Sequence, residues 1–337
     1  MNHLDPAPII DLLEGFRRSK TMFAAVNLEV FDALTEQPRT GAELAAMCGM
    51  SVEPLTRLLE ACVSLGLLLS EDGRFRNTPV SETFLTRTSP QSLVGYVLYS
   101  NNALYQLFVH LEDAVKEGTP RWQQTFGWPA PIFEHFFSTP EKMREFIMGM
   151  HGFGLSTSPA VARAFDLSAF HTIADLGAAT GHLTIAACEA WPQLSGVVFD
   201  LPPVVPFAAE QIAKSSAASR ISTVAGDFFK DELPNADLYA LGRILHDWSE
   251  DRIRHLLRRI CERLPSGGAL LIAEKLLHED RTGPASAYMQ SLSMLVCTEG
   301  RERTLTEYQA LLTEAGFARV EGKRTGKYLD AILASKD

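Results

Sequence analysis

The feature that most constrains the fold is a regular alternation of short β-rich runs with helical segments after residue 160. Each run holds four or five mostly apolar residues, which is typical of strands buried on both faces of a sheet. Strands that alternate with helices predict a doubly wound, Rossmann-like α/β sheet. The expected strands are Thr172–Leu176, Gly196–Phe199, Ile221–Val224, Leu238–Leu241, Ala269–Ala273 and Ala331–Ala334.

The N-terminal region shows a different pattern. Apolar residues recur at helical spacing from Ile9 to Leu34, and the polar patch Arg17–Lys20 interrupts them, so we expect two short helices there. Residues 40–66 are typical of a helix-turn-helix that ends at a glycine. Two short apolar runs then flank an Asp72-Gly73 turn, which predicts the wing of a winged helix.

A chain of 337 residues is long enough for two domains. We expect an α-helical winged-helix domain at residues 1–100 and the α/β domain at 101–337. The first part of the second domain, about 101–160, is expected to be a helical linker. Its aromatic residues would form the roof of an apolar pocket as a group, although any single one is equally explained by core packing.

The composition excludes several classes of partner. A net charge of −10 disfavours nucleic acid, because binding to phosphates needs clustered Lys and Arg. The second helix of the helix-turn-helix holds Glu53 and Glu60 against Arg57 alone. The five cysteines form no C-x-x-C pair, no run reaches the ~20 apolar residues of a membrane span, and the N-terminus lacks the basic start and apolar stretch of a signal peptide. We therefore expect a cytoplasmic protein without a nucleic-acid or membrane partner.

The first expected strand leads into a glycine-containing loop that suits a bound cofactor. Gly177 and Gly181 allow the backbone to approach a ligand, but Ala179 between them breaks the G-x-G-x-x-G pattern of a nicotinamide dinucleotide site. Asp175 precedes the loop, and a carboxylate there favours a cationic ligand over a pyrophosphate. The sulfonium of S-adenosylmethionine has the matching charge.

Two more acids follow the next two strands. Asp200 ends the second strand, where a carboxylate accepts hydrogen bonds from ribose hydroxyls. Asp227 follows the third strand and would accept a hydrogen bond from the adenine amino group, while Phe228 would border the ring. A turn or helix cap is the alternative role for Asp227.

A candidate base follows the fourth strand. His246 lies at the carboxyl end of the expected sheet, where ligands of open α/β folds bind. Imidazole removes a proton from a phenol, whose pKa is ~10, if a carboxylate holds its other nitrogen. Glu274, Glu302 and Glu299 are the candidate carboxylates. A helix cap or a packed core histidine is the alternative.

Together these segments closely resemble the acetylserotonin O-methyltransferase family, especially the methyltransferase domain of the acetylserotonin O-methyltransferase-like proteins, within the plant-caffeate-type O-methyltransferases. The resemblance spans nearly the whole chain. The residues that carry it are Val198–Pro202, Ala225–Pro234, Arg243–Trp248, Met294–Thr304 and Tyr328–Ala334.

The resemblance implies that the N-terminal domain forms a homodimer and that no metal is needed. It implies His246 as general base, flanked by Glu274 and Glu302, and a substrate contact from Asp247. Ser293 and Cys297 stand where acetylserotonin enzymes place an asparagine and a glutamine against the substrate, so acetylserotonin is not the expected acceptor. The cofactor-binding residues expected from the loop and the resemblance are Asp175, Gly177, Gly181, Asp200, Leu201, Gly226, Asp227, Phe228 and Arg243.

Several residues depart from the family pattern. Ala178 and Ala179 replace glycines in the cofactor loop, and a methyl group there narrows the approach of a ligand. Phe137 and Gly154 stand where relatives place a tyrosine and a tryptophan against the cofactor. These departures predict weaker cofactor binding.

The leading hypothesis is methyl transfer from S-adenosylmethionine, leaving S-adenosylhomocysteine, to the hydroxyl of a small aromatic substrate such as a phenol or hydroxyindole. Two alternatives remain. One is a cofactor-binding pseudoenzyme or regulatory dimer with little methyl transfer, and the other is a winged-helix transcription regulator. The sequence leaves open whether the acceptor atom is oxygen, nitrogen, sulfur or carbon.

Overall fold

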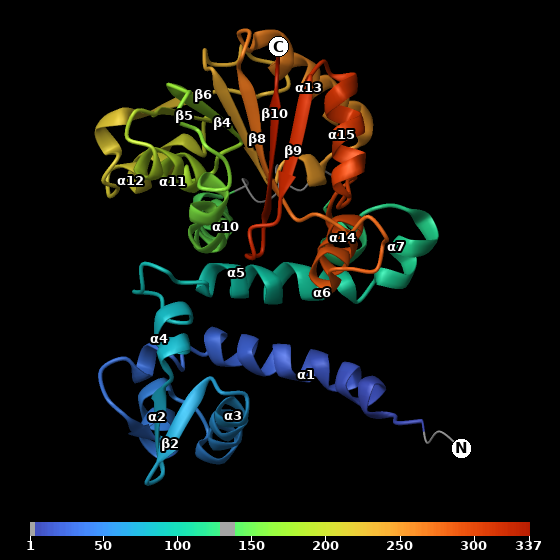
Figure 1. The fold of residues 1–337 in the computed structure, drawn as a ribbon. Coiled ribbons are helices and arrows are strands. Elements are labelled where there is room, and N and C mark those ends of the chain that lie inside the picture. Colours follow the sequence, from blue (N-terminus) through green and yellow to red (C-terminus); the bar gives the residue numbers. More distant parts are fainter. Residues whose placement is uncertain (1–3, 129–138) are drawn as a thin grey trace. The chain divides into compact units, whose positions relative to one another are not determined.

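The computed structural model describes residues 4–128 and 139–337, so the expectation for Phe137 lies outside the described residues. The chain forms two compact units, Met1–Ala103 and Leu104–Asp337. Figure 1 shows the helices of the first unit and the sheet of the second.

The first unit begins with one long helix, α1, at Ala7–Asn27, so the expectation of two short helices is wrong. The polar patch does not break the helix because its side chains lie in solvent and form ion pairs along it, Arg17 with Glu14 at 2.7 Å and Arg18 with Asp11 at 2.8 Å. The other elements are η1 (Asp32–Leu34), β1 (Arg39–Thr40), α2 (Gly41–Cys48), α3 (Val52–Ser64), β2 (Leu68–Glu71), β3 (Arg74–Asn77), α4 (Pro79–Phe84) and α5 (Val94–Tyr99).

Local sequence signals set the ends of these elements. Helix α2 starts at a capping box, in which the Thr40 side chain and the Glu43 side chain each accept from the other residue's backbone N–H. It ends at Gly49, which adopts a left-handed conformation. Asp72 and Gly73 both have positive φ, as a tight hairpin turn between β2 and β3 requires.

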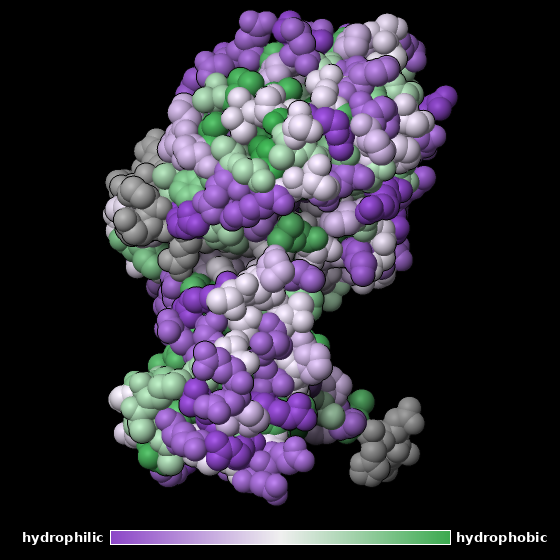
Figure 2. Space-filling model, turned by 90° about the vertical axis from the view of Figure 1, so that its left-hand side faces the viewer, coloured by the Kyte–Doolittle hydropathy of each residue, from purple (hydrophilic) through white to green (hydrophobic). Residues whose placement is uncertain are grey.

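Helix α1 leaves large apolar side chains in solvent. Ile9, Leu12, Leu13 and Phe16 are each more than half exposed. Apolar residues gathered on one exposed helix are typical of a surface that another protein covers. None of the helices in the described residues is long and apolar enough to cross a membrane. Figure 2 shows one face of the molecule, where hydrophilic and hydrophobic residues are interspersed.

The second unit is built on a seven-stranded sheet with the order β6-β5-β4-β7-β8-β10-β9. The first five of these pair in parallel, and β10 is antiparallel to both of its neighbours. All six expected strands are present, and β9 is an additional edge strand. The strands are β4 (Thr172–Leu176), β5 (Ser195–Asp200), β6 (Ile221–Ala225), β7 (Leu238–Gly242), β8 (Ala269–Glu274), β9 (Arg319–Lys323) and β10 (Asp330–Ser335).

Helices cover both faces of this sheet, with α11 and α12 on one side and α13 and α15 on the other (Figure 1). The expectation of a Rossmann-like α/β fold is confirmed by this architecture. The helices of this unit are α6 (Tyr105–Phe108), α7 (Leu111–Glu117), α8 (Trp122–Phe126), α10 (Pro140–Ala162), α11 (His182–Ala190), α12 (Val205–Ile212), η3 (Ala218–Arg220), η4 (Leu245–Asp247), α13 (Glu250–Arg263), α14 (Ala285–Cys297) and α15 (Leu305–Glu314).

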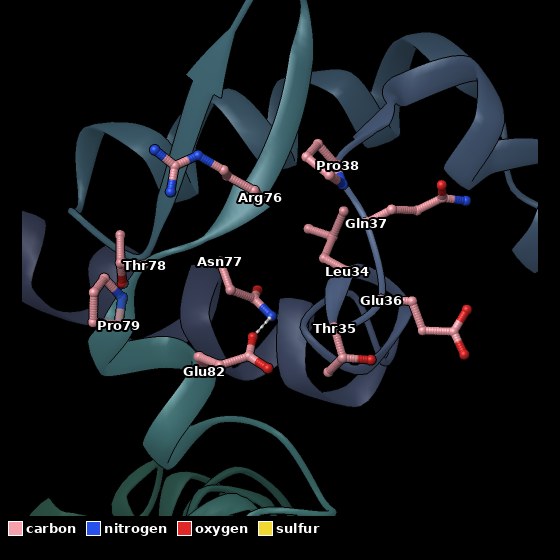
Figure 3. Close-up of a pocket in the computed structure, with 10 residues that line it drawn as sticks. All are labelled: Leu34, Thr35, Glu36, Gln37, Pro38, Arg76, Asn77, Thr78, Pro79 and Glu82. Carbon is pink, nitrogen blue, oxygen red and sulfur yellow. Dashed lines mark hydrogen bonds between the residues drawn. The ribbon is translucent and has the colours of Figure 1, made fainter.

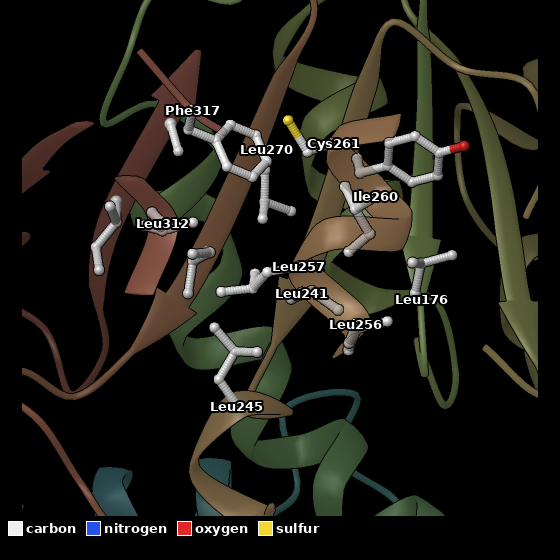
Figure 4. Packing of buried hydrophobic residues seen from close by; sticks show 14 of the residues in the cluster. Leu176, Leu241, Leu245, Leu256, Leu257, Ile260, Cys261, Leu270, Leu312 and Phe317 are labelled. Carbon is white, nitrogen blue, oxygen red and sulfur yellow. The ribbon is translucent and has the colours of Figure 1, made fainter. Parts of the chain in front are cut away.

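The largest hydrophobic cluster lies between the sheet and the helices α13 and α15 (Figure 4). Leu257 of α13 is fully buried within it, close to Leu241 and Leu270 of the strands. Leu245 of η4 belongs to the same cluster. The core therefore anchors the turn that carries His246.

The strand order changes direction beside β4, because β5 follows β4 on one side and β7 lies on the other. Loops that leave the two strands in opposite directions open a crevice at their carboxyl ends, where open α/β sheets bind ligands. The loop after β4 and the turn after β7 border this crevice. Gly177, Gly181, Arg243 and His246 lie on these two segments, and the other candidate cofactor residues lie in β4 or at the ends of β5 and β6.

We predict that Leu257→Ala lowers the free energy of unfolding by about 2–5 kcal/mol, because it leaves a cavity in a packed core. Val224→Ala on β6 is the matched control, since Val224 is 41% exposed. That control should change stability by no more than about 0.5 kcal/mol. Urea unfolding of both variants measures the difference. Equal losses would contradict the assignment of the core.

Candidate active site

The loop from Gly177 to Gly181 joins β4 to α11 and depends on its two glycines. Both have positive φ, 69° at Gly177 and 75° at Gly181. A Cβ at Gly177 would lie 2.6 Å from Ile244 Cδ1, and one at Gly181 would lie 2.8 Å from Val198 Cγ2. Any side chain at either position would therefore clash and be strained.

The two alanines of this loop differ from each other. Ala179 has a φ of +50°, a left-handed conformation that costs about 1–2 kcal/mol for a residue with a Cβ. Its backbone N–H donates to Asp200 Oδ2 at 2.7 Å. Ala178 has no positive φ and is buried in a cluster with Val198 and Ala208. Only Ala179 therefore carries backbone strain.

The acids at the ends of β4 and β5 are close enough to influence each other. Asp175 is buried and accepts a hydrogen bond from the Thr184 hydroxyl at 3.0 Å. Burial raises its pKa to about 7, and the nearby Asp200 adds to this. Burial also raises the pKa of Asp200 to about 6, although the N–H groups of Ala179 and Leu201 oppose the shift. A cation bound here would favour ionisation of both carboxyls.

The end of β6 also borders the cofactor loop. Gly226 is required there, because a Cβ would lie 2.4 Å from the Phe199 ring. The Phe228 ring lies 3.1 Å from the position of a Cβ on Gly177, so it flanks the loop. Asp227 accepts from the backbone N–H of Phe229 at 2.9 Å and pairs with Lys230 at 2.9 Å. The turn-capping role of Asp227 is therefore present in this structure.

Helix α10 adds contacts that the sequence patterns do not indicate. His151 Nδ1 lies 2.7 Å from the Thr180 hydroxyl, and His182 Nδ1 lies 2.8 Å from the Ser158 hydroxyl. Gly154 faces the same imidazole, since a Cβ on it would lie 2.3 Å from the His182 ring. Burial lowers the pKa of His151 to about 4 and that of His182 to about 3, so both rings are neutral at pH 7.

Arg243 follows β7 and faces the same helix. Its guanidinium lies 4.6 Å from the centre of the Phe153 ring, and Nη1 lies 3.6 Å from Met150 Sδ. Arg243 has a positive φ of 57°, which turns the chain sharply at the end of the strand. Its backbone N–H donates to the Ala273 carbonyl of β8 at 3.0 Å. Arg243 thus lies at the crevice. In the sequence it stands between the cofactor loop and His246.

His246 is buried with two carboxylates. Its Nδ1 lies 2.7 Å from Glu302 Oε1 and 3.2 Å from Glu274 Oε2. Because carboxylates accept, Nδ1 carries a proton and donates to Glu302, so Nε2 is the acceptor when the ring is neutral. Glu274 Oε1 also accepts from the backbone N–H groups of Leu245, at 2.9 Å, and His246, at 3.3 Å. Glu302 thus orients the ring, and Glu274 fixes its backbone.

The charges around His246 set its proton affinity. Burial alone lowers the pKa of His246, but Glu274, Glu302 and Asp247 outweigh burial and raise it to about 9. Burial raises the pKa of the Glu274 carboxyl. Although ligand atoms of His246, Glu274 and Glu302 lie within 4.8 Å of one another, we interpret the cluster as a hydrogen-bonded acid–base group, because Nδ1 is directed at Glu302.

The remaining expected residues are distributed unevenly. Asp247 Oδ1 lies 3.7 Å from His246 Nε2, on the acceptor side of the ring. Ser293 and Cys297 are both buried on α14, which packs against η4, and the Ser293 hydroxyl donates within the helix to Met289. Glu299 does not join His246 and instead pairs with Arg252 at 3.6 Å.

A cluster of stacked aromatic rings caps the end of α14. Trp122 donates from its indole N–H to the Cys297 carbonyl at 2.8 Å. The Trp122 and Trp128 rings stack at 5.3 Å, and the Phe126 and Trp128 rings at 4.7 Å. This part of the expected aromatic roof is therefore fixed to the helix that carries Ser293 and Cys297.

The first unit has a shallow pocket of about 330 Å³ between η1 and β3 (Figure 3). The Asn77 amide donates there to Glu82 Oε2 at 2.6 Å and to the Phe31 carbonyl at 2.9 Å. These bonds tie α4 and β3 to the segment before η1. We assign the pocket a structural role. Its lining residues are Leu34, Thr35, Glu36, Gln37, Pro38, Arg76, Asn77, Thr78, Pro79 and Glu82.

Comparison with known proteins agrees with this site, which combines strand-end acids, a glycine loop and a histidine bound to carboxylates. Residues 108–318 match the O-methyltransferase domain, and residues 10–87 match the O-methyltransferase dimerisation domain. The chain belongs to the O-methyltransferase family. It is 41% identical to human acetylserotonin O-methyltransferase over 333 residues, covering 97% of this chain and 96% of that protein.

Two further relatives in this family are similar along the whole chain. The chain is 39% identical over 334 residues to a human protein described as a probable bifunctional dTTP/UTP pyrophosphatase/methyltransferase, and it spans 54% of that longer protein. The solved structure of human N-acetylserotonin methyltransferase in complex with SAM superposes with a TM-score of 0.93 at 40% identity, covering 100% of this chain and 99% of that one. The resemblance to the acetylserotonin O-methyltransferases is thereby confirmed.

The strain at Ala179 gives a test of the cofactor loop. Ala179→Gly should raise the free energy of unfolding by about 0.5–1 kcal/mol, because glycine adopts the left-handed conformation without a Cβ clash. Ala178→Gly is the matched control and should lower stability, since it removes a buried methyl group and adds backbone freedom. Thermal unfolding of both variants compares them. A loss of stability in both variants would contradict the loop geometry.

Proposed function

We propose that this O-methyltransferase transfers a methyl group from S-adenosylmethionine to the hydroxyl of a small aromatic substrate. The observation that carries this proposal is His246, whose Nδ1 donates to Glu302 while Nε2 stays available as a base. A hydroxyl acceptor needs such a base, because a phenol with a pKa of ~10 is mostly protonated near pH 7.

The chain's residues around the crevice fit this cofactor. Asp200 ends β5, where a carboxylate accepts from ribose hydroxyls, and Leu201 follows it. Phe228 would border the adenine ring, and the Asp175 and Asp200 carboxyls suit a positively charged ligand. Arg243 would contact the cofactor at the carboxyl end of β7. When bound, the cofactor supplies an electrophilic methyl group on a sulfonium.

His246 then removes the proton of the acceptor hydroxyl. Nε2 takes the proton, the ring becomes imidazolium, and Glu302 and Glu274 stabilise its charge. The acceptor oxygen, now carrying more negative charge, is the nucleophile in the methyl transfer. General-base catalysis of this kind contributes about 10²–10⁴ in rate. We propose that the chemistry requires no metal.

An aromatic acceptor is supported by the ring stack of Trp122, Phe126 and Trp128, which is fixed to α14. Ser293 and Cys297 are small side chains on the same helix, and Asp247 lies near Nε2. We therefore propose a phenol or hydroxyindole as acceptor, with Asp247, Ser293 and Cys297 along its site. The dimerisation domain and the exposed apolar side chains of α1 support a homodimer.

One observation favours a second function. Ala179 adopts a left-handed conformation in the cofactor loop. A methyl group there narrows the approach of the cofactor, and a pseudoenzyme or regulatory dimer with little turnover would tolerate the weaker binding. An experiment can distinguish the two functions, because a pseudoenzyme binds S-adenosylmethionine without consuming it. Calorimetric titration with the cofactor, followed by the turnover assay below, decides between them.

We predict methylated products, detected by mass, when the protein is incubated with S-adenosylmethionine and a panel of phenols, catechols and hydroxyindoles. His246→Gln should lower the turnover rate by about 10²–10⁴-fold while cofactor binding is retained, because only the base is lost. A chelator should leave turnover unchanged. Full turnover in His246→Gln would contradict the base assignment, and absence of product with every acceptor despite cofactor binding would favour the pseudoenzyme.

The rate should depend on pH through His246. Because the base acts as the neutral imidazole and its pKa is raised to about 9, kcat should rise from pH 7 and level off above about pH 9. Glu302→Gln removes a negative charge beside Nδ1 and should move the midpoint to lower pH, since the imidazolium loses stabilisation. Rate profiles of both proteins from pH 6 to 10 measure this. A midpoint that does not move would contradict the pairing.

A further inference from the structure

The turn that carries His246 is held at both backbone polar groups of the residue before it, Leu245. The Leu245 N–H donates to Glu274 Oε1 at 2.9 Å, and the Leu245 carbonyl accepts from Arg303 Nη1 at 3.4 Å. The same Nη1 donates to the Arg301 carbonyl at 3.0 Å. One guanidinium group therefore joins the backbone just before His246 to the backbone just before Glu302.

Arg303 is enclosed at this place. Its residue is only 1% exposed, and it is the largest fully buried side chain in the described part of the chain. The segment before it is pressed against the turn, because a Cβ on Gly300 would lie 2.0 Å from the His246 carbonyl oxygen. Small movements of the guanidinium would therefore shift the turn and the Glu302 segment relative to each other.

The charge of Arg303 also balances its surroundings. A guanidinium stays protonated in proteins, so it is a permanent positive charge in the interior. Glu274, Glu302 and Arg303 all act electrostatically on the buried hydroxyl of Tyr308, so their charges influence the same region of the interior. Positive charges near these carboxylates lower the cost of burying them, and Asp247 beside His246 adds a third acid to the group.

The neighbouring Arg301 shows what a surface arginine does in the same segment. It pairs with Glu307 at 2.8 Å and with Glu250 at 3.2 Å, and its side chain is 42% exposed. Pairs of this kind contribute about 0–1 kcal/mol to stability. Arg301 therefore provides a matched control, with the same residue type two positions away and its guanidinium directed at surface carboxylates.

We propose that Arg303 is a positioning residue for the methyl transfer, which holds the His246 turn and the Glu302 segment together and supplies the positive charge that offsets the two carboxylates. This inference rests on the proposed role of His246 as base. The charged groups that act on His246 are Glu274 from β8, Glu302 from the segment after α14 and Asp247 from its own turn, and Arg303 reaches this turn through the Leu245 carbonyl. Without the guanidinium, the carboxylates would bind the imidazole proton more strongly.

The test compares Arg303→Met and Arg303→Lys with Arg301→Met. For each variant we would measure kcat and KM, the Kd for S-adenosylmethionine by calorimetry, and the titration of the His246 ring by NMR with ¹³C-labelled histidine. Arg303→Met should lower kcat by about 10–100-fold, as expected for a displaced catalytic group, with the cofactor Kd within about twofold. Its His246 ring should titrate at higher pH.

The lysine variant separates charge from geometry. Arg303→Lys keeps the charge, so the His246 titration should stay near that of the unchanged protein. Its single ammonium group lacks the guanidinium fork, so kcat should still fall by about tenfold. Arg301→Met should leave kcat and the titration unchanged, because its main partners are the carboxylates of Glu250 and Glu307, and its bond to the Glu302 carbonyl is long, at 3.5 Å.

Several results would overturn the inference. A folded Arg303→Met variant whose kcat equals that of Arg301→Met would do so, as would an unchanged His246 titration with kcat and cofactor affinity lowered by the same factor. If Arg303→Met does not fold, an Arg303→Lys variant with normal kcat overturns it. Full turnover in His246→Gln would remove the proposed base instead, and the NMR titration of Arg303→Met would still show whether Arg303 acts on the ring.

Discussion

The parallel register of the central strands is the constraint on which the whole site depends. Asp200 pairs with Ala225, and Gly242 pairs with Ala273, so the residues that follow β5, β6, β7 and β8 meet at one edge of the sheet. No single segment carries the chemistry. A shift of one strand by one residue would turn its side chains to the opposite face and separate the acids from the loop.

The sequence predicted the carboxyl ends of the strands well, because buried parallel strands appear in it as continuous apolar runs. All six predicted apolar runs form strands. Asp175 lies in β4, Asp200 ends β5 and His246 follows β7, so these three residues lie near the crevice. Edge strand β9 was missed because Arg319–Lys323 alternates charged side chains with only partial burial. Helix α1 was divided wrongly because charged side chains that pair along a helix in solvent resemble a break when the pattern is judged by apolar spacing alone.

Other parts of the site have no local signature. Nothing near His182 in the sequence indicates that its ring lies against Gly154 and Ser158, since the contact depends on how α10 packs on α11. The family resemblance already favoured Glu274 and Glu302 over Glu299, but the pairing of Glu299 with the surface residue Arg252 has no local signature. Arg303 stood within a family motif, but its bond to the Leu245 carbonyl arises only when two distant segments meet.

The buried carboxyls of Asp175 and Asp200 have a consequence for how the site distinguishes ligands. With pKa values of about 7 and about 6, Asp175 is partly protonated near pH 7 and Asp200 is mostly ionised. A sulfonium bound beside them would displace those protons, whereas the uncharged thioether left after methyl transfer would not. Proton release would then accompany loading and proton uptake would accompany the loss of the charge. Mildly alkaline conditions would thus favour the fresh cofactor over the spent one at the same set of contacts.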